Sequence, residues 1–391
     1  MVVAEAILRA LQLAFFMFWE VLWPLALGFL LSAVVQAVVS KGSVARVLGT
    51  DNPRGVALAC AFGAASSSCS YAAVAVARAL FLRGATLANS IIFEFASTNL
   101  VFELGLVMFV LLGWQFVAAE FAGGILMIVI LAVVFRLTLS RHLVASAQRQ
   151  AVKGLVGRME GHGTMDMSVT EGPFLKRLFS GSAFTSVAHY FYMDIYSLWT
   201  DLVLGFLIAG ALASWVPNDF WTGLFLTDHP GAAAIWGPFI GPIISMLSFV
   251  CSVGNVPLAA VLWNGGISFG GVIAFIFSDL IIIPILDIYR KYYGGRVTAY
   301  LFGVSYLAMA ASGLVIELAF QSLGLAPNHQ PIAVLESHPA WNYTSFLDLA
   351  FLALMGILGW RFLVTGGPAM VRMMNQPQGH TTDSHNHHHA A

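Results

Sequence analysis

The sequence contains very little charge. Lysine, arginine, aspartate and glutamate make up 9% of the 391 residues, whereas about 25% is usual in a soluble domain. Apolar residues make up 59%, and the mean hydropathy is +0.83. This composition excludes a water-soluble globular protein and predicts an all-α polytopic membrane protein.

Cysteines and nucleotide-binding signals are also scarce. The three cysteines, Cys60, Cys69 and Cys251, have no paired spacing, which excludes a disulfide framework and a zinc finger. No phosphate-binding loop of the G-x-x-x-x-G-K-[ST] type occurs in the sequence. We therefore expect no ATP-driven step within this chain and no cofactor.

Long apolar runs fill most of the chain. Windows of about 20 apolar residues predict membrane spans near residues 13–39, 86–112, 115–136, 195–215, 268–289, 298–321 and 345–364. Two further apolar stretches, 55–82 and 235–262, are interrupted. The first contains the polar run 66–70, and the second contains Gly254 and Pro257, which disfavour a continuous helix through that point.

Positive charge is missing from two long stretches, and this absence gives an orientation. No lysine or arginine occurs within 178–289 or 297–360. If both interrupted stretches are re-entrant hairpins, every basic cluster except Arg9 lies on the cytoplasmic side of the membrane. If the first stretch crosses the membrane completely instead, the basic cluster at 41–54 lies outside.

One segment of the sequence occurs twice. Residues 66–104 align without a gap with residues 248–286, and 11 of the 39 aligned positions are identical, Cys69 and Cys251 among them. Apolar bias alone would give roughly three or four matches. Duplicated halves with interrupted apolar segments are typical of transporters whose substrate site lies between the halves.

The repeat and the breaks together predict the architecture. We expect two inverted-topology repeats, each with a broken or re-entrant helix, plus one extra C-terminal transmembrane helix. The predicted divisions are repeat 1 at 1–140, a cytoplasmic connecting loop at 141–190, repeat 2 at 191–325, an outer loop with the last transmembrane helix at 326–370, and a disordered cytoplasmic tail at 371–391.

The two breaks carry motifs that resemble a known family. Residues 63–71 read Gly-Ala-Ala-Ser-Ser-Ser-Cys-Ser-Tyr, residues 76–85 read Val-Ala-Arg-Ala-Leu-Phe-Leu-Arg-Gly-Ala, and residues 251–260 read Cys-Ser-Val-Gly-Asn-Val-Pro-Leu-Ala-Ala. Over roughly residues 10–325 the chain resembles the predicted-permease family that includes organoarsenical efflux permeases (ArsP/YraQ-like). The resemblance implies a bacterial inner-membrane permease that exports soft metalloid or metal compounds. Many relatives carry a Cys-Ser-Cys or similar pair in the first motif, and Ser67 stands here in place of the first cysteine, which argues against a three-thiolate arsenic site.

The two matched cysteines are the first candidate substrate ligands. Trivalent arsenic, antimony and Cu(I) favour thiolate over oxygen ligands, and the amino ends of half-helices favour the thiolate form. Two thiols suffice for a methylated arsenical, which offers only two labile positions. As packing residues, Cys69 and Cys251 would instead let the hairpins approach closely. Polar residues near the breaks could line the same site or cap the half-helices. They are Ser70, Ser252, Asn255 and Asn99.

Carboxyl groups inside predicted spans suggest a functional role, because placing one at the bilayer centre costs about 2.5–3.5 kcal/mol on insertion scales. We predict Glu94 and Asp279, which fall near mid-span, and Glu103 as proton-coupling groups. Glu103 could also pair with Arg78 or lie near the outer surface. Asp287 adjoins a basic cluster, so we interpret it as an interfacial charge. We expect helix-end or packing charges at Glu20, Glu120, Asp201, Glu317 and Asp348.

Histidines gather in the C-terminal tail. This composition is typical of a metal-binding tract, without any link to the transported species. Its candidate ligands are His380, His385, His387, His388 and His389.

Three functions remain open. The first is a secondary exporter of a metalloid or metal species by alternating access, coupled to protons. The second is a membrane thiol–disulfide relay through Cys69 and Cys251, and the third is a passive channel for another small solute. We favour the exporter, because it uses the repeat, the breaks and the buried acids together. We thus predict a permease and not an enzyme, with a small-molecule or metalloid substrate, the lipid bilayer as surroundings, no nucleic-acid partner, and an inner (plasma) membrane location that the resemblance implies.

Overall fold

The computed structural model describes residues 2–38, 47–68, 70–151, 169, 180–248, 252–327 and 343–375. Regular structure within these residues is helical throughout. The helices are α1 (Val2–Val38), α3 (Pro53–Ser66), α4 (Ser70–Leu82), α5 (Leu87–Asn99), α6 (Phe102–Leu111), α7 (Trp114–Thr138), α8 (Arg141–Ala151), α11 (Gly181–Trp215), α12 (Asn218–Phe225), α13 (Pro230–Ser248), α14 (Ser252–Asn264), α15 (Phe269–Ile276), the 3-10 helix η1 (Phe277–Ile281), α16 (Ile283–Tyr293), α17 (Gly295–Ser322), α18 (Tyr343–Val364) and α19 (Gly367–Asn375).

Many of these helices are long and apolar enough to cross a membrane. Within the described residues there are six: Ala4–Val34, Leu87–Leu111, Trp114–Thr138, Pro230–Ser248, Gly295–Ser322 and Ser345–Val364. Counting two bent pairs raises the number to as many as eight; they are Leu202–Trp215 with Asp219–Phe225, and Phe269–Ile281 with Ile283–Tyr293. The chain is therefore a multi-pass membrane protein, as its composition predicts.

The first predicted break is confirmed, and the second is not where the sequence suggested. Helix α3 ends at Ser66, Ser67 has a φ of 31°, and α4 begins only at Ser70. In the second copy, however, α14 begins at Ser252 and continues through Gly254 and Pro257 to its end. The prediction of an interruption at Gly254 and Pro257 is wrong. Pro257 removes one backbone hydrogen bond, but every residue from Ser252 to Trp263 is buried, and packing against neighbouring helices overrides that local preference.

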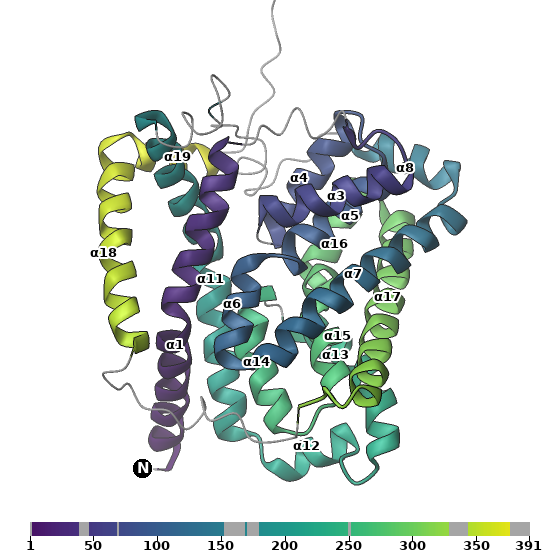
Figure 1. Cartoon of the computed structure of the whole chain (residues 1–391), viewed down its shortest axis with the longest axis vertical. Coiled ribbons are helices and arrows are strands. Elements are labelled where there is room, and N and C mark those ends of the chain that lie inside the picture. Colours follow the sequence, from purple (N-terminus) through teal and green to yellow (C-terminus); the bar gives the residue numbers. More distant parts are fainter. Residues whose placement is uncertain are drawn as a thin grey trace, which may run out of the picture.

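The two interrupted segments lie in opposite halves of the molecule (Figure 1). Helices α3 and α4 lie in the upper half with α8, whereas α13 and α14 lie in the lower half above α12. Helices α1, α11 and α18 stand side by side at one edge and contact one another. The two interrupted segments thus lie beside this edge, with α4 and α14 as their more buried helices.

Helices α15 and α17 cross in direct backbone contact. A methyl group added to Gly270 would lie 2.2 Å from the carbonyl oxygen of Gly313, and one added to Gly313 would lie 2.6 Å from the carbonyl oxygen of Gly270. Small residues at a crossing let helices approach closely within a bilayer, where lipid offers no hydrophobic drive to pack them. This crossing holds the segment that continues into η1.

We expect Gly313→Ala to lower the free energy of unfolding by about 1–3 kcal/mol, because the added methyl overpacks the crossing. Thermal unfolding of the detergent-solubilised protein measures this loss. The matched control is Gly303→Ala on the same helix, where no atom lies within 4 Å of the added methyl; its stability should equal that of the wild type or exceed it by up to about 1 kcal/mol, because alanine favours a helix more than glycine does. Equal stabilities of the two variants would contradict the close crossing.

Candidate substrate site

The break between α3 and α4 is closed by hydrogen bonds from three other helices. The backbone N–H of Ser68 donates to the carbonyl of Ser97 at 2.9 Å, and the hydroxyl of Ser32 donates to the carbonyl of Ser67 at 2.8 Å. The hydroxyl of Ser67 in turn donates to the carboxyl of Glu103. Backbone groups freed within a membrane need such partners. Because these hydrogen bonds supply them, the break is a stable part of the fold.

A small polar cavity lies at this break and reaches the start of α14. Its volume is about 20 Å³, enough for one water molecule, which needs roughly 10–15 Å³ of such space. The first interrupted segment contributes Ser67 and Ser68, and the second contributes Ser252 and Val253. The remaining lining residues are Phe29, Ser32, Thr98, Val101, Glu103 and Asp194.

Asp279 joins the two copies of the repeated segment. It is fully buried on η1, and the hydroxyl of Ser70 at the start of α4 donates to its Oδ2 at 2.6 Å. Thr98 and Asn99 at the end of α5 lie beside this carboxyl without completing a hydrogen bond to it. The first residue of α4, in the first copy, is thereby hydrogen-bonded to a carboxyl group of the second copy.

Glu94 lies in the same buried region. It is fully buried on α5 and accepts a hydrogen bond from the hydroxyl of Tyr289 on α16. Its second carboxyl oxygen has no partner among the described residues. Glu94 also lies within electrostatic reach of Asp279, so the two predicted coupling acids form one group.

Glu120 is a third member of this group that sequence reasoning missed. We expected a helix-end or packing charge, but Glu120 lies inside α7, is fully buried, and is also within electrostatic reach of Asp279. Neither of its carboxyl oxygens has a partner among the described residues. Its sequence signal was an acidic residue inside an apolar span, the same signal that singled out Glu94.

Glu103 belongs to a separate polar network beside the cavity. It is buried and bound to Ser67, so the alternative of a pair with Arg78 is wrong, and its place near the outer membrane surface stays a prediction. Arg78 instead donates to the carbonyl of Ala151 and lies over the ring of Tyr292. Glu103 lies in the first turn of α6, directly after the short interruption at Leu100 and Val101 that separates α5 from α6.

This network continues to α11. The amide nitrogen of Gln36 donates to the hydroxyl of Ser32 and to the carboxyl of Asp194, each at 3.0 Å. Both Ser32 and Asp194 line the cavity together with Glu103. The cavity is therefore lined by two carboxyl groups, of Glu103 and Asp194, together with serine and threonine hydroxyls.

The remaining predicted residues divide between this site and structural positions. Asn255 holds α14 to α13, because its side chain bonds to the hydroxyls of Ser245 and Ser248. Asn99 donates to the carbonyl of Phe95 and the hydroxyl of Thr98 within α5. Cys69, Cys251 and the five tail histidines lie outside the described residues. Within the described part, no group of three or more His, Cys, Asp or Glu residues could hold a metal ion.

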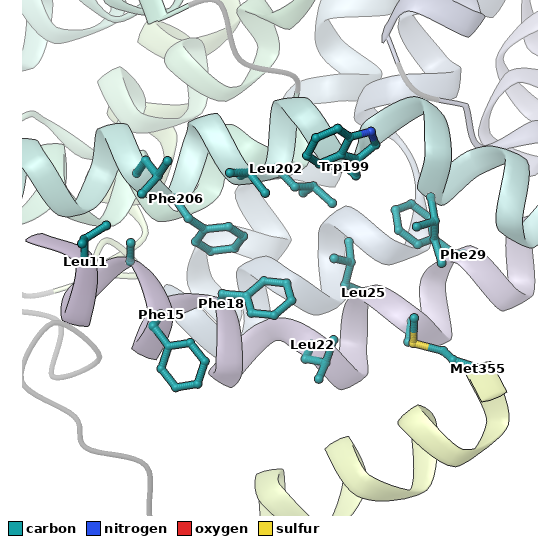
Figure 2. Close-up of a pocket in the computed structure, with 15 residues that line it drawn as sticks. Leu11, Phe15, Phe18, Leu22, Leu25, Phe29, Trp199, Leu202, Phe206 and Met355 are labelled. Atoms are coloured by element: carbon teal, nitrogen blue, oxygen red, sulfur yellow. The ribbon is translucent and has the colours of Figure 1, made fainter. Parts of the chain in front are cut away.

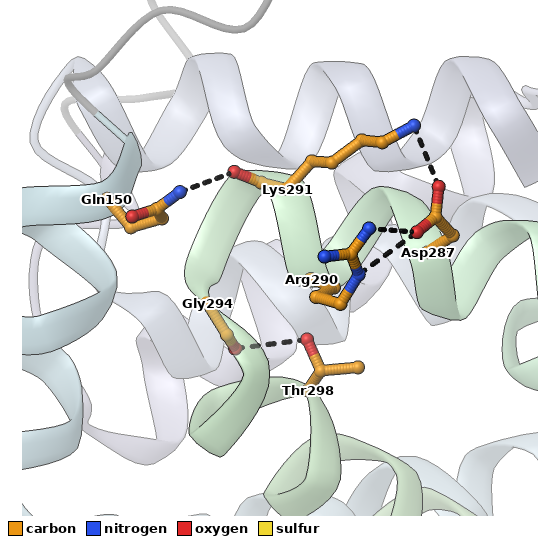
Figure 3. Close-up of polar contacts among 6 residues, drawn as sticks. All are labelled: Gln150, Asp287, Arg290, Lys291, Gly294 and Thr298. Atoms are coloured by element: carbon orange, nitrogen blue, oxygen red, sulfur yellow. Dashed lines mark hydrogen bonds and ion pairs between the residues drawn. The ribbon is translucent and has the colours of Figure 1, made fainter.

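Asp287 lies apart from the site (Figure 3). Its carboxyl forms ion pairs at 2.7 Å with both Arg290 and Lys291, and all three side chains are well exposed. The backbone carbonyl of Lys291 also accepts a bond from Gln150 of α8 at 3.1 Å. The interpretation as an interfacial charge is consistent with this geometry.

The geometry defines what the site can do chemically. The cavity offers hydroxyl donors and carboxyl acceptors to a small polar group. None of Glu94, Glu120 and Asp279 forms an ion pair with a described residue, and burying an unpaired carboxylate is costly. The fold therefore accommodates these acids better as neutral groups than as carboxylates.

Comparison with known proteins decides the family. A family model described as "Predicted permease", ArsP_1, matches residues 6–318. The chain belongs to the ArsP_1 family. It is 54% identical over 338 residues to "Putative permease Rv2963" of Mycobacterium tuberculosis, a match that covers 86% of this chain and 83% of that protein. No solved structure matches the chain.

Membership makes this protein a membrane permease and agrees with the resemblance drawn from the two motifs. The matched range contains both interrupted segments, the cavity and all three buried acids, whereas α18 and α19 lie beyond it. The ArsP_1 match thus covers the whole candidate site.

We expect Glu120→Met to raise the free energy of unfolding of this ArsP_1 permease by about 1–3 kcal/mol, because it removes a buried polar group that lacks a partner. Chemical or thermal unfolding in detergent measures the gain. Glu317→Met is the matched control, since the carboxyl of Glu317 accepts from the backbone N–H of Gly270 and the amide of Gln321. That control should be destabilised, and a loss of stability in both variants would refute the unpaired state of Glu120.

Proposed function

We propose that this permease exports a soft metalloid or metal species of the organoarsenical type, by alternating access between two inverted repeats, with protons as the coupling ion. The observation that carries the proposal is the polar cavity where Ser67 and Ser68 of one interrupted segment meet Ser252 of the other. In transporters built from inverted repeats, the substrate site lies where the half-helices of the two repeats approach each other.

The helix bounds support a structural repeat. Helix α14 starts and ends 182 residues after α4 starts and ends. The continuous segment of α15 and η1 likewise starts and ends 182 residues after α5. Thr86 and Ser268 cap the helices that follow, each accepting from the backbone N–H three residues on. Opposite halves of Figure 1 hold the two interrupted segments, as inversion requires. On this interpretation, residues 1–140 and 191–325 are the repeats.

The neighbours of the two cysteines support thiol ligands. Cys69 lies in sequence between Ser68, which lines the cavity, and Ser70, which binds Asp279. Cys251 directly precedes Ser252, another lining residue. A soft trivalent metalloid prefers thiolates to the hydroxyls that surround it there. With Ser67 in place of a further cysteine, two thiols match an arsenical that keeps one organic group.

The buried acids support proton coupling. Glu94 and Glu120 each lie within electrostatic reach of Asp279, and all three are fully buried and form no ion pair with described residues. In a coupled exporter, such groups bind protons from one side and release them to the other. The hydroxyls of Ser70 and Tyr289 already bond to two of them, which gives a route for protons out of the group.

The basic residues support an orientation in a plasma membrane. Arg141 and Arg149 of α8 and the pair Arg290 and Lys291 of α16 belong to elements that contact each other through Gln150. Positive charge gathers on the cytoplasmic side of bacterial inner-membrane proteins. That end of the molecule is therefore assigned to the cytoplasm, with the connecting segment 141–190 and the tail 371–391.

We expect cells that express the wild type to accumulate less methylarsenite than cells that express Cys69→Ser or Cys251→Ser, because export needs both thiols. Elemental mass spectrometry of metal-sensitive cells measures methylarsenite, arsenite, antimonite, copper and zinc in parallel. The control is Cys60→Ser, a half-buried position on α3 outside the cavity, which should behave as the wild type. Equal accumulation in every strain would refute thiol-dependent export, and a redox-dependent Cys69–Cys251 crosslink without flux would point to the thiol relay.

Asp279→Asn and Glu94→Gln should each reduce gradient-driven export by about tenfold or more, a barrier increase of about 1.4 kcal/mol, since an amide cannot carry the coupled proton. Proteoliposomes with an imposed pH gradient measure the rate. The exposed, ion-paired Asp287 supplies the control, and Asp287→Asn should change the rate less than about twofold. A wild-type flux that ignores the gradient would instead identify a passive channel.

A further inference from the structure

An apolar groove runs between α1 and α11 (Figure 2). Its volume is about 390 Å³, and its walls are hydrocarbon or aromatic side chains with one methionine, Met355 of α18. On α1 the groove extends from Leu11 to Phe29, and Trp199, Leu202 and Phe206 line it from α11. Two spans of this multi-pass chain thus leave an opening between them that no polar side chain occupies.

The groove opens outward and closes inward. Phe15, Trp199 and Val203 lie at its open side and are 52%, 54% and 47% exposed. In a protein with membrane-spanning helices, apolar side chains exposed to this extent face lipid. Other lining residues are buried, and Phe29 among them is only 4% exposed. The groove therefore has a lipid-facing rim and a buried wall that includes Phe29.

Phe29 belongs to two cavities at once. It lines the apolar groove and also the polar cavity that contains Ser67, Glu103 and Ser252. Its ring packs edge-to-face against Phe191, with ring centroids 6.5 Å apart. The lipid-facing groove and the candidate substrate site consequently share one aromatic side chain, and a rotamer change of that side chain alters both cavities.

We propose that the substrate passes laterally between the bilayer and the polar cavity through this groove, with Phe29 as the barrier. The proposal rests on the proposed function, since it takes the cavity as the substrate site. It deepens that function by naming the route by which a partly apolar, uncharged substrate reaches the site.

The physical basis is the difference between apolar bodies and ions in such a groove. Burying apolar surface is favourable by about 25 cal/mol per Å², whereas an ion in surroundings without polar partners is strongly disfavoured. An organic arsenical with a phenyl or methyl group can therefore use the groove. A free metal cation or an inorganic oxyanion cannot.

The test compares two neighbouring tryptophan substitutions. Val203 and Leu204 are adjacent on α11 and equally exposed, at 47% and 46%, but only Val203 lines the groove. Val203→Trp should fill the mouth and reduce export of phenylarsine oxide from metal-sensitive cells by about tenfold. Leu204→Trp should leave export within about twofold of the wild type. Equal export by the two variants would overturn the lateral route while leaving the proposed function intact.

A second readout tests the route without transport. A photoreactive phenyldiazirine dissolved in vesicles should label Ser32 or Glu103, beyond Phe29, in the wild type and in Leu204→Trp but not in Val203→Trp. Peptide mass spectrometry locates the label. Labelling that stops at Phe15 and Trp199 would mean that lipid chains alone occupy the groove, which refutes the proposal. Labelling beyond Phe29 in a protein that exports no arsenical would refute the proposed function and uphold the route.

Discussion

A broken helix inside a membrane depends on one constraint, which is that each freed backbone group must find a partner within the protein. At the α3–α4 break the partners are the carbonyl of Ser97 and the hydroxyl of Ser32. Meeting this constraint brings α1 and α5 to the break and leaves the hydroxyl of Ser67 free to bind Glu103. The polar interior of the molecule is thus a consequence of closing the break.

The same constraint explains why polar groups from distant parts of the chain meet. Ser70 begins α4 directly after the break, and its hydroxyl reaches Asp279, a residue 209 positions later. The close crossing at Gly270 and Gly313 holds the helix before Asp279 against α17. Ser70 and Asp279 therefore lie on closely packed helices, while the separate cavity beside Ser67 and Glu103 has room for about one water molecule.

The sequence predicts the class of fold well because the bilayer limits what a chain can do. Composition, apolar run length and the polar run at 66–70 each reflect a physical requirement of the membrane, and the structure agrees with them. The prediction at Gly254 and Pro257 failed because local helix propensity is weaker than burial on all sides. For the site, the sequence identified Glu94 and Asp279 as buried acids but could not separate Glu120 from a packing charge. That distinction depends on which hydrogen-bond partners the fold brings to a carboxyl group. Such partners come from distant helices, so the sequence of one helix does not predict them.

Helix α8 has a mechanical consequence. Its last turn is tied on one side to α4, through Arg78 and the carbonyl of Ala151 at 2.8 Å, and on the other to α16, through Gln150 and the carbonyl of Lys291 at 3.1 Å. This short helix thereby connects α4 to α16 at one end of the molecule. A displacement of α4 relative to α16 has to carry α8 with it or break one of these two hydrogen bonds, so α8 restrains the relative movement of the two helices at this end.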